Sequence, residues 1–163
     1  MWRHEGEIEH LIRESAEAFV LDRHQLARLR HEAGGFDRGI WTGIAEMGWT
    51  GILLPEATGG SDLPLSAALV VAEIFGRRLL PEPFVENAVI SATLLALSGT
   101  ALAQASARQL ATGEKRYSLA HSEKNAAALS TRVSAADDML CLNGAKALVS
   151  GWSDDVSMLV TAM

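Results

Sequence analysis

Residues 49–60 read WTGILLPEATGG, and this stretch decides how the first part of the chain is organised. The apolar residues 52–54 end at Pro55, which has no amide hydrogen and disfavours helical angles in the residue before it. Gly59 and Gly60 then permit backbone angles that other residues avoid. The stretch therefore predicts a buried loop between helices that turns back sharply on itself.

The sequence before this loop has helical periodicity. Apolar residues recur at helical spacing from Ile8 to Leu26 and predict one long amphipathic helix, which AGG at 33–35 ends. Asp37 is placed to cap a second helix, and Gly48 is placed to close it.

The sequence after the loop predicts further helices. Pro64 suits the first turn of the next one. Residues 85–98 are almost wholly apolar or small, which predicts a helix buried on most sides. Thr100 is placed to cap a last helix and Gly113 to end it.

The pattern changes after Lys115, where short apolar runs alternate with polar residues, as is typical of strands. Asn143-Gly144 lies between MLCL and AKALV and predicts a two-residue hairpin. The final run, VSMLVTAM, predicts another strand.

The expected fold class is α+β. An all-helical part over 1–115 is followed, over 116–163, by the first strands of an incomplete β-barrel-like domain. So few strands leave bare edges. Either the sequence is truncated, which we favour, or another chain completes the sheet.

Composition excludes several classes of function. The net charge of −6 over 163 residues disfavours nucleic acid, which needs a basic face, and the basic run at 23–31 is typical of a solvated helix face. No apolar run approaches ~20 residues, so no membrane span is expected. The start of the chain lacks the apolar region of a signal peptide, and Cys141 is the lone cysteine. A cytoplasmic protein with a buried, inert thiol is expected.

Common catalytic motifs are absent from the sequence. It has no GxGxxG or P-loop pattern, and GWSDD at 151–155 lacks the closing glycine of a nucleophile elbow. The five histidines have no paired-ligand spacing, so no metal site is expected. The residues alone therefore predict an architecture and no reaction.

A family resemblance extends this prediction. The order of EMGW at 46–49, PEATGG at 55–60 and the helix carrying Glu73 and Gly76-Arg77 resembles the N-terminal helical domain of the acyl-CoA dehydrogenases. ATGEKRYSLAHSE at 111–123 and LNGAKALVSG at 142–151 resemble that family's passage into its middle β domain and a hairpin within it. Each motif alone has little specificity, but their order and spacing match across nearly the whole chain.

The resemblance implies FAD-dependent α,β-dehydrogenation of an acyl-CoA thioester. It also implies which residues lie beside the flavin: His121 and Ser122 in AHSE, and Leu148, Val149 and Ser150 in the later segment. Without the resemblance, both serines read as ordinary hydroxyls at strand ends.

The sequence also departs from the family pattern. Leu148 stands where the family has a tryptophan, and the loop after Glu123, which in the family helps to hold CoA, is shorter and less polar. The family's catalytic glutamate lies in a C-terminal helical bundle that this sequence does not contain. Glu56 and Glu73 read as architectural acids, and Glu123 lies near the flavin position without being the base. No catalytic residue is assigned.

Three functions stay open at this stage. The chain is a fragment of an acyl-CoA dehydrogenase with little activity alone, or a non-catalytic subunit of a heteromeric one, or a helical interaction module without flavin. The expected partners are an acyl-CoA substrate and a full-length family member in a homo- or hetero-oligomer.

Overall fold

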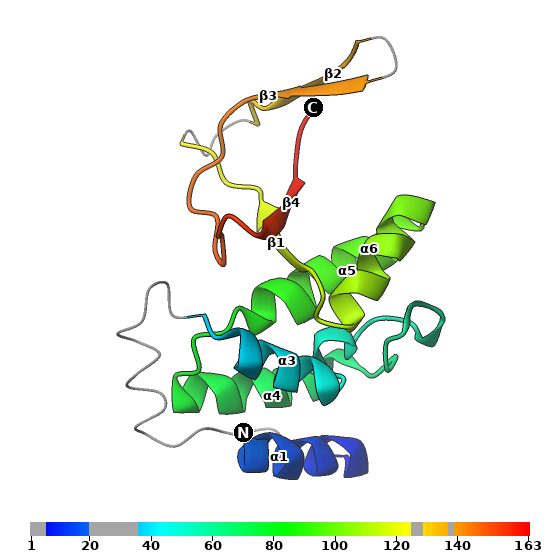
Figure 1. The fold of residues 1–163 in the computed structure, drawn as a ribbon, viewed down its shortest axis with the longest axis vertical. Coiled ribbons are helices and arrows are strands. Elements are labelled where there is room, and N and C mark those ends of the chain that lie inside the picture. Colours follow the sequence, from blue (N-terminus) through cyan, green and yellow to red (C-terminus); the bar gives the residue numbers. More distant parts are fainter. Residues whose placement is uncertain (1–5, 20–35, 125–128, 137–138) are drawn as a thin grey trace.

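The structure, a computed structural model, describes residues 6–19, 36–124, 129–136 and 139–163. Its helices come first along the chain and its strands last, so the predicted α+β class is confirmed (Figure 1). The helices are α1 Glu7–Phe19, α3 Arg38–Glu46, α4 Leu65–Arg78, the π-helix η3 Val85–Ser91, α5 Ala92–Ser98 and α6 Ala101–Ala111, with short 3-10 helices η1 Trp49–Gly51 and η2 Glu56–Thr58. The strands are β1 Arg116–Ala120, β2 Arg132–Ala136, β3 Met139–Asn143 and β4 Val156–Val160.

The predicted helix caps are confirmed. The Asp37 carboxylate accepts a hydrogen bond from the Ile40 amide at 3.0 Å and starts α3. The Thr100 hydroxyl accepts one from the Ala103 amide at 3.2 Å and starts α6. Both side chains satisfy an amide that the first helical turn leaves unpaired. The first helix is described as far as Phe19, and the rest of its predicted length, with its AGG end, lies outside the described residues.

The loop at 49–60 doubles back, as its sequence predicts, but it is buried mainly in its first half, since Pro55, Glu56 and Ala57 are exposed. Ile52 and Leu54 are almost fully buried, and the Thr50 hydroxyl donates to the Ala111 carbonyl at 2.7 Å. Gly60 has no room for a side chain, because a Cβ there would lie 2.0 Å from the Leu54 carbonyl oxygen. The loop is therefore anchored against α6 at one end and against itself at the other.

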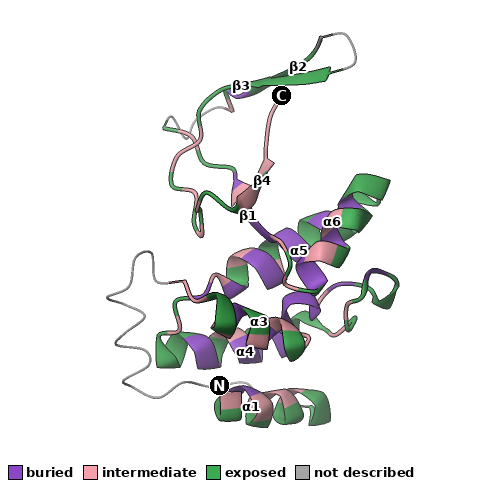
Figure 2. Ribbon diagram, viewed as in Figure 1, coloured by how far each residue is buried: buried purple, intermediate pink, exposed green. Residues whose placement is uncertain are grey.

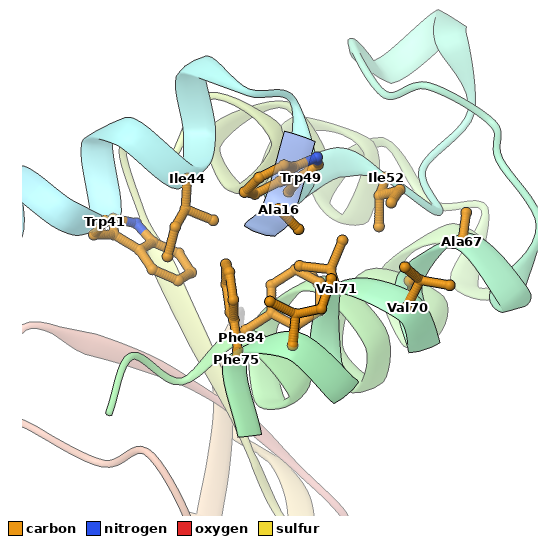
Figure 3. Packing of buried hydrophobic residues seen from close by; sticks show 13 residues of the cluster. Ala16, Trp41, Ile44, Trp49, Ile52, Ala67, Val70, Val71, Phe75 and Phe84 are labelled. Carbon is orange, nitrogen blue, oxygen red and sulfur yellow. The ribbon is translucent and has the colours of Figure 1, made fainter. Parts of the chain in front are cut away.

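Aromatic residues from several helices form the larger hydrophobic core (Figure 3). The Trp49 ring meets the Phe75 ring edge-on at 5.8 Å, and Phe75 meets Phe84 in the same way at 5.3 Å. The Trp41 indole nitrogen donates to the Gly113 carbonyl at 3.0 Å, which ties α3 to the segment that leads into β1. This core holds together the helices next to which β1 and β4 lie.

The strands form two small sheets. β1 pairs in parallel with β4, and β2 pairs antiparallel with β3. Residues 161–163 join the sheets, since the Met163 amide donates to the Thr131 carbonyl at 3.0 Å and the Thr161 amide donates to the Ala120 carbonyl at 3.3 Å. The β1–β4 pair lies next to the helices, and the β2–β3 ribbon lies far from them with mostly exposed residues (Figure 2).

Two sequence-based expectations were wrong, one about a turn between strands and one about the burial of a helical segment. Asn143-Gly144 does not turn a hairpin: β3 ends at Asn143, and residues 144–149 form no strand. Gly144 instead allows a close approach, because a Cβ there would lie 2.5 Å from the Thr131 hydroxyl oxygen. The segment 85–98 is buried on one side only, since Leu94 and Leu97 are 40% and 79% exposed.

No helix in the described ranges combines the length and the apolar character that a membrane crossing requires.

Candidate functional site

The two segments predicted to lie beside a flavin are neighbours in space. The Ala147 amide donates to the Ser122 carbonyl at 2.8 Å, and the Lys146 ammonium lies 3.3 Å from the His121 carbonyl. Ser122 and Leu148 are both exposed, and Leu148 is 94% exposed with a left-handed φ of 54°. The pairing leaves a serine side chain and an apolar side chain accessible on adjacent segments.

Ser150, the last of the five predicted flavin contacts along the chain, is held against a helix. Its hydroxyl donates to Glu86 Oε1 at 2.5 Å, and Glu86 belongs to the π-helix η3. Gly151 follows with φ 69°, and a Cβ there would lie 3.3 Å from the Ser118 hydroxyl oxygen and 3.4 Å from the Glu86 Cγ. The partly buried Val149 lies between the exposed Leu148 and this anchored serine.

Glu123 and Lys146 fix the frame around Ser122. Their charged atoms lie 2.7 Å apart, and their side chains are only 5% and 9% exposed. Glu123 also accepts hydrogen bonds from the Thr131 hydroxyl at 2.6 Å, the Thr131 amide at 3.0 Å, the Ser130 amide at 2.7 Å and the Ser130 hydroxyl.

These bonds determine the charge state of Glu123. The Lys146 ammonium, followed by the Ser130 and Thr131 hydroxyls, holds the pKa of Glu123 far below its usual range. A carboxylate so strongly stabilised in its ionised form is a poor proton acceptor, because a general base works best with a pKa near the operating pH. Glu123 is therefore a structural acid.

The other acids considered from sequence lie on the surface of the helical part. Glu73 makes ion pairs with Arg13 at 3.2 Å and Arg77 at 3.8 Å, and Glu56 is an exposed residue at the start of η2. The sequence analysis did not predict a role for Glu86. The sequence does single this residue out, because Glu86 is the one charged residue within 85–98.

An apolar groove runs beside the paired segments, between α5, α6 and the β1–β4 sheet. It encloses about 550 Å³ and is lined by leucines of all these elements, Leu94, Leu102, Leu119 and Leu159 among them. His121 and Thr161 lie at the groove, with the His121 Nδ1 3.2 Å from the Thr161 hydroxyl oxygen. Its lining includes no Asp, Glu, Lys or Arg residue, which fits an apolar ligand or side chain.

Cys141 does not have the buried position expected of it. It is exposed on β3, all of whose residues face solvent. Within the described ranges, no group of three His, Cys, Asp or Glu residues is placed to hold a metal ion.

Comparison with known proteins identifies the fold. Residues 6–114 match the family model described as the N-terminal domain of acyl-CoA dehydrogenase. The chain is 28% identical, with a TM-score of 0.81, to a structure described as the Tcur3481-Tcur3483 steroid ACAD G363A variant, covering 96% of this chain and 44% of that one.

Two further structures have the same fold. An acyl-CoA dehydrogenase from Geobacillus kaustophilus is 20% identical, with a TM-score of 0.84 and coverage of 99% and 44%. The ChsE4-ChsE5 complex from Mycobacterium tuberculosis is 21% identical, with a TM-score of 0.79 and coverage of 91% and 42%. The chain thus spans less than half the length of these structures. A search of curated proteins gave no match.

Proposed function

Since the chain belongs to the acyl-CoA dehydrogenase family, we propose that it forms the N-terminal part of an FAD-dependent dehydrogenase acting on an acyl-CoA thioester. The observation that carries this proposal is the bond between the Ala147 amide and the Ser122 carbonyl, which holds the two flavin-facing segments together. A helical part over 1–115, a β part over 116–163 and a cytoplasmic location belong to the same proposal.

The exposed groups on these segments fit one edge of a flavin. In this proposal the Ser122 hydroxyl donates to a polar edge of the ring, and Leu148 with Val149 gives apolar contact to its face. His121 and Ser150 flank these residues, and the Ser150 hydroxyl is oriented by Glu86 at 2.5 Å. Bound FAD would supply the acceptor for a hydride from the substrate.

The thioester's tail has a matching surface in the apolar groove beside α5 and α6. Burying methylene groups there is favourable by about 0.8 kcal/mol each. No residue of this chain is proposed as the catalytic base, because Glu123 is committed to Lys146, Ser130 and Thr131.

A non-catalytic subunit is the second candidate function. Leu148 favours the non-catalytic subunit, because a leucine covers a flavin ring less fully than the tryptophan of the family pattern. A homo- or hetero-oligomer with a full-length family member would then supply the base and the rest of the flavin site. The relatives described as Tcur3481-Tcur3483 and as the ChsE4-ChsE5 complex are each named for two proteins.

The test is flavin binding by the purified chain, alone and co-expressed with a full-length homologue. We expect a flavin absorption band that an acyl-CoA bleaches when the homologue is present. Ser122→Ala and Leu148→Asp should each weaken FAD binding about tenfold or more, and Ser134→Ala, an exposed serine on β2, should leave it unchanged. A colourless preparation in both states would favour an interaction module without flavin.

A further inference from the structure

A second cleft begins at Gly151, directly after the segment that carries Ser150, and shares no lining residue with the apolar groove. It opens between the start of α3, the proline-rich corner at 81–83 and the loop at 151–155, and encloses about 380 Å³. This volume is at the small end of ligand pockets. Its lining brings together two arginines, one aspartate and two aromatic residues, which come from segments distant in sequence.

Arg116 is the fixed cation of this cleft. Its side chain is 7% exposed, and its guanidinium carbon lies 3.6 Å from the centre of the Phe36 ring. One nitrogen, Nη2, donates to Asp155 at 2.6 Å and to Ser153 at 3.1 Å. A guanidinium carries five N–H donors. Within the described part of the chain, the side-chain hydrogen bonds of Arg116 all start from Nη2, so Nε and Nη1 have no hydrogen-bond partner.

A second guanidinium reaches the same carboxylate. Arg38 Nη2 lies 3.3 Å from the second oxygen of Asp155, and its side chain is 72% exposed. The Ser153 hydroxyl and then Arg116 lower the pKa of Asp155 to about 2, so this carboxylate is ionised at neutral pH. Among the residues that line the cleft, two guanidinium groups and one carboxylate leave one positive charge in excess, with N–H donors to spare.

The cleft also has flat apolar walls. Trp152 is 57% exposed, and the rings of Pro81 and Pro83 line the same space. An exposed tryptophan beside rigid proline rings offers a large contact area that loses little conformational entropy on binding.

We propose that this cleft binds a small aromatic carboxylate, with its carboxylate on Arg116 and Arg38 and its ring against Trp152. The planar guanidinium fork matches a carboxylate in geometry, and the single net positive charge matches a monoanion better than a dianionic phosphate. This inference does not depend on flavin binding, since none of the proposed flavin contacts lines the cleft.

The test is titration of the purified chain with benzoate, monitored by isothermal calorimetry and by the indole N–H signals in NMR spectra. We expect saturable binding that shifts the Trp152 signal, identified by its absence from Trp152→Phe. Arg38→Gln should weaken binding about tenfold, and Trp152→Ala should also weaken it. Both side chains are largely exposed, so neither change should disturb folding. Arg77→Gln, which removes another exposed arginine, should leave binding unchanged.

Benzamide and inorganic phosphate separate the two parts of the proposal. Benzamide keeps the ring without the charge, and phosphate keeps charge without the ring, so each should bind far more weakly than benzoate. The proposal is wrong if benzoate fails to bind, if Arg38→Gln binds it as tightly as the parent chain does, or if phosphate or benzamide binds equally well.

Discussion

Glu123 and Lys146 form a nearly buried ion pair, with charged atoms 2.7 Å apart, between residues separated by 23 positions in the sequence. The pair lies where β1 ends, and Lys146 also reaches the Thr161 hydroxyl at 3.3 Å, just after β4. It therefore ties together the end of each strand in the β1–β4 pair and the segment that faces Ser122.

Removing the cation should destabilise this part of the chain. Lys146→Met leaves the Glu123 carboxylate buried without its countercharge, which costs more than the pair itself contributes. We expect a lower urea midpoint and faster hydrogen exchange at residues 121–124 and 146–150. The double variant Glu123→Gln/Lys146→Met should recover part of the loss. Equal losses in the single and double variants would show that the charges are not coupled.

The same pair sets the response of the fold to acid. The folded-state pKa of Glu123 is depressed, so its stabilising contribution is present above the ordinary value of 4.5 and is lost as the pH falls below it. Urea midpoints of the parent chain and the double variant should therefore converge as the pH is lowered from 5 towards 3. A constant difference over this range would contradict the assignment.

Glu82 should act in the opposite direction. Burial raises its pKa to about 6, and its Oε2 has no partner within the described residues. The folded-state pKa of Glu82 lies above the ordinary 4.5, so ionisation of Glu82 lowers the free energy of unfolding as the pH rises from 4.5 past 6. The difference corresponds to about 2 kcal/mol at neutral pH.

Glu82→Gln should therefore raise the free energy of unfolding by about 1–2 kcal/mol at pH 7 and by almost nothing near pH 4.5. The amide oxygen can still accept the Asp37 amide hydrogen, which Glu82 Oε1 accepts at 3.3 Å. Urea titrations at the two pH values measure the gain, with the exposed Glu56→Gln as control. A gain that is equal at both pH values would rule out the charge as its cause.

Two glycine substitutions should have opposite effects. At Gly60 a Cβ would lie 2.0 Å from the Leu54 carbonyl oxygen, so Gly60→Ala must displace the loop and should cost at least about 2 kcal/mol. At Gly76, inside α4, a Cβ would meet nothing within 4 Å, so Gly76→Ala should gain about 0.5–1 kcal/mol. Thermal unfolding of both variants measures the difference, and a neutral Gly60→Ala would mean that the loop adapts freely.

Exposed leucines on α5 and α6 should affect association more than folding. Leu97 and Leu102 are each 79% exposed, so Leu97→Gln and Leu102→Gln should change the unfolding free energy by less than about 0.5 kcal/mol. Both should reduce concentration-dependent self-association in sedimentation experiments, because they remove exposed apolar surface. The buried Leu95→Gln is the contrasting variant and should destabilise the fold strongly.

Features set by local chemistry were predictable from the sequence. Asp37 and Thr100 cap helices because each bonds an amide three residues along the chain. The bend at 55–60 was predictable for the same reason, since proline and glycine restrict or free the backbone wherever they occur. The order of such motifs also identified the family, which the match over residues 6–114 confirms.

Features set by distant partners were not predictable. Asn143-Gly144 has a hairpin sequence, but Gly144 is required for its contact with Thr131, 13 positions earlier. The exposure of Leu97 depends on which elements pack against α5, and the contact of Glu86 with Ser150 spans 64 positions. The flavin contacts assigned to His121, Ser122, Leu148, Val149 and Ser150 remain predictions.

The parallel pairing of β1 with β4 has a consequence for the order of folding during synthesis. Arg116 pairs with Val156, so β1 leaves the ribosome well before its partner strand exists. At about 5–20 residues per second this interval lasts roughly 2–8 s. By then the ribosome has already made all the residues that form the helices up to Ala111. The Asn87 side-chain oxygen that accepts the Tyr117 amide at 2.7 Å can hold the nascent strand in place until β4 arrives.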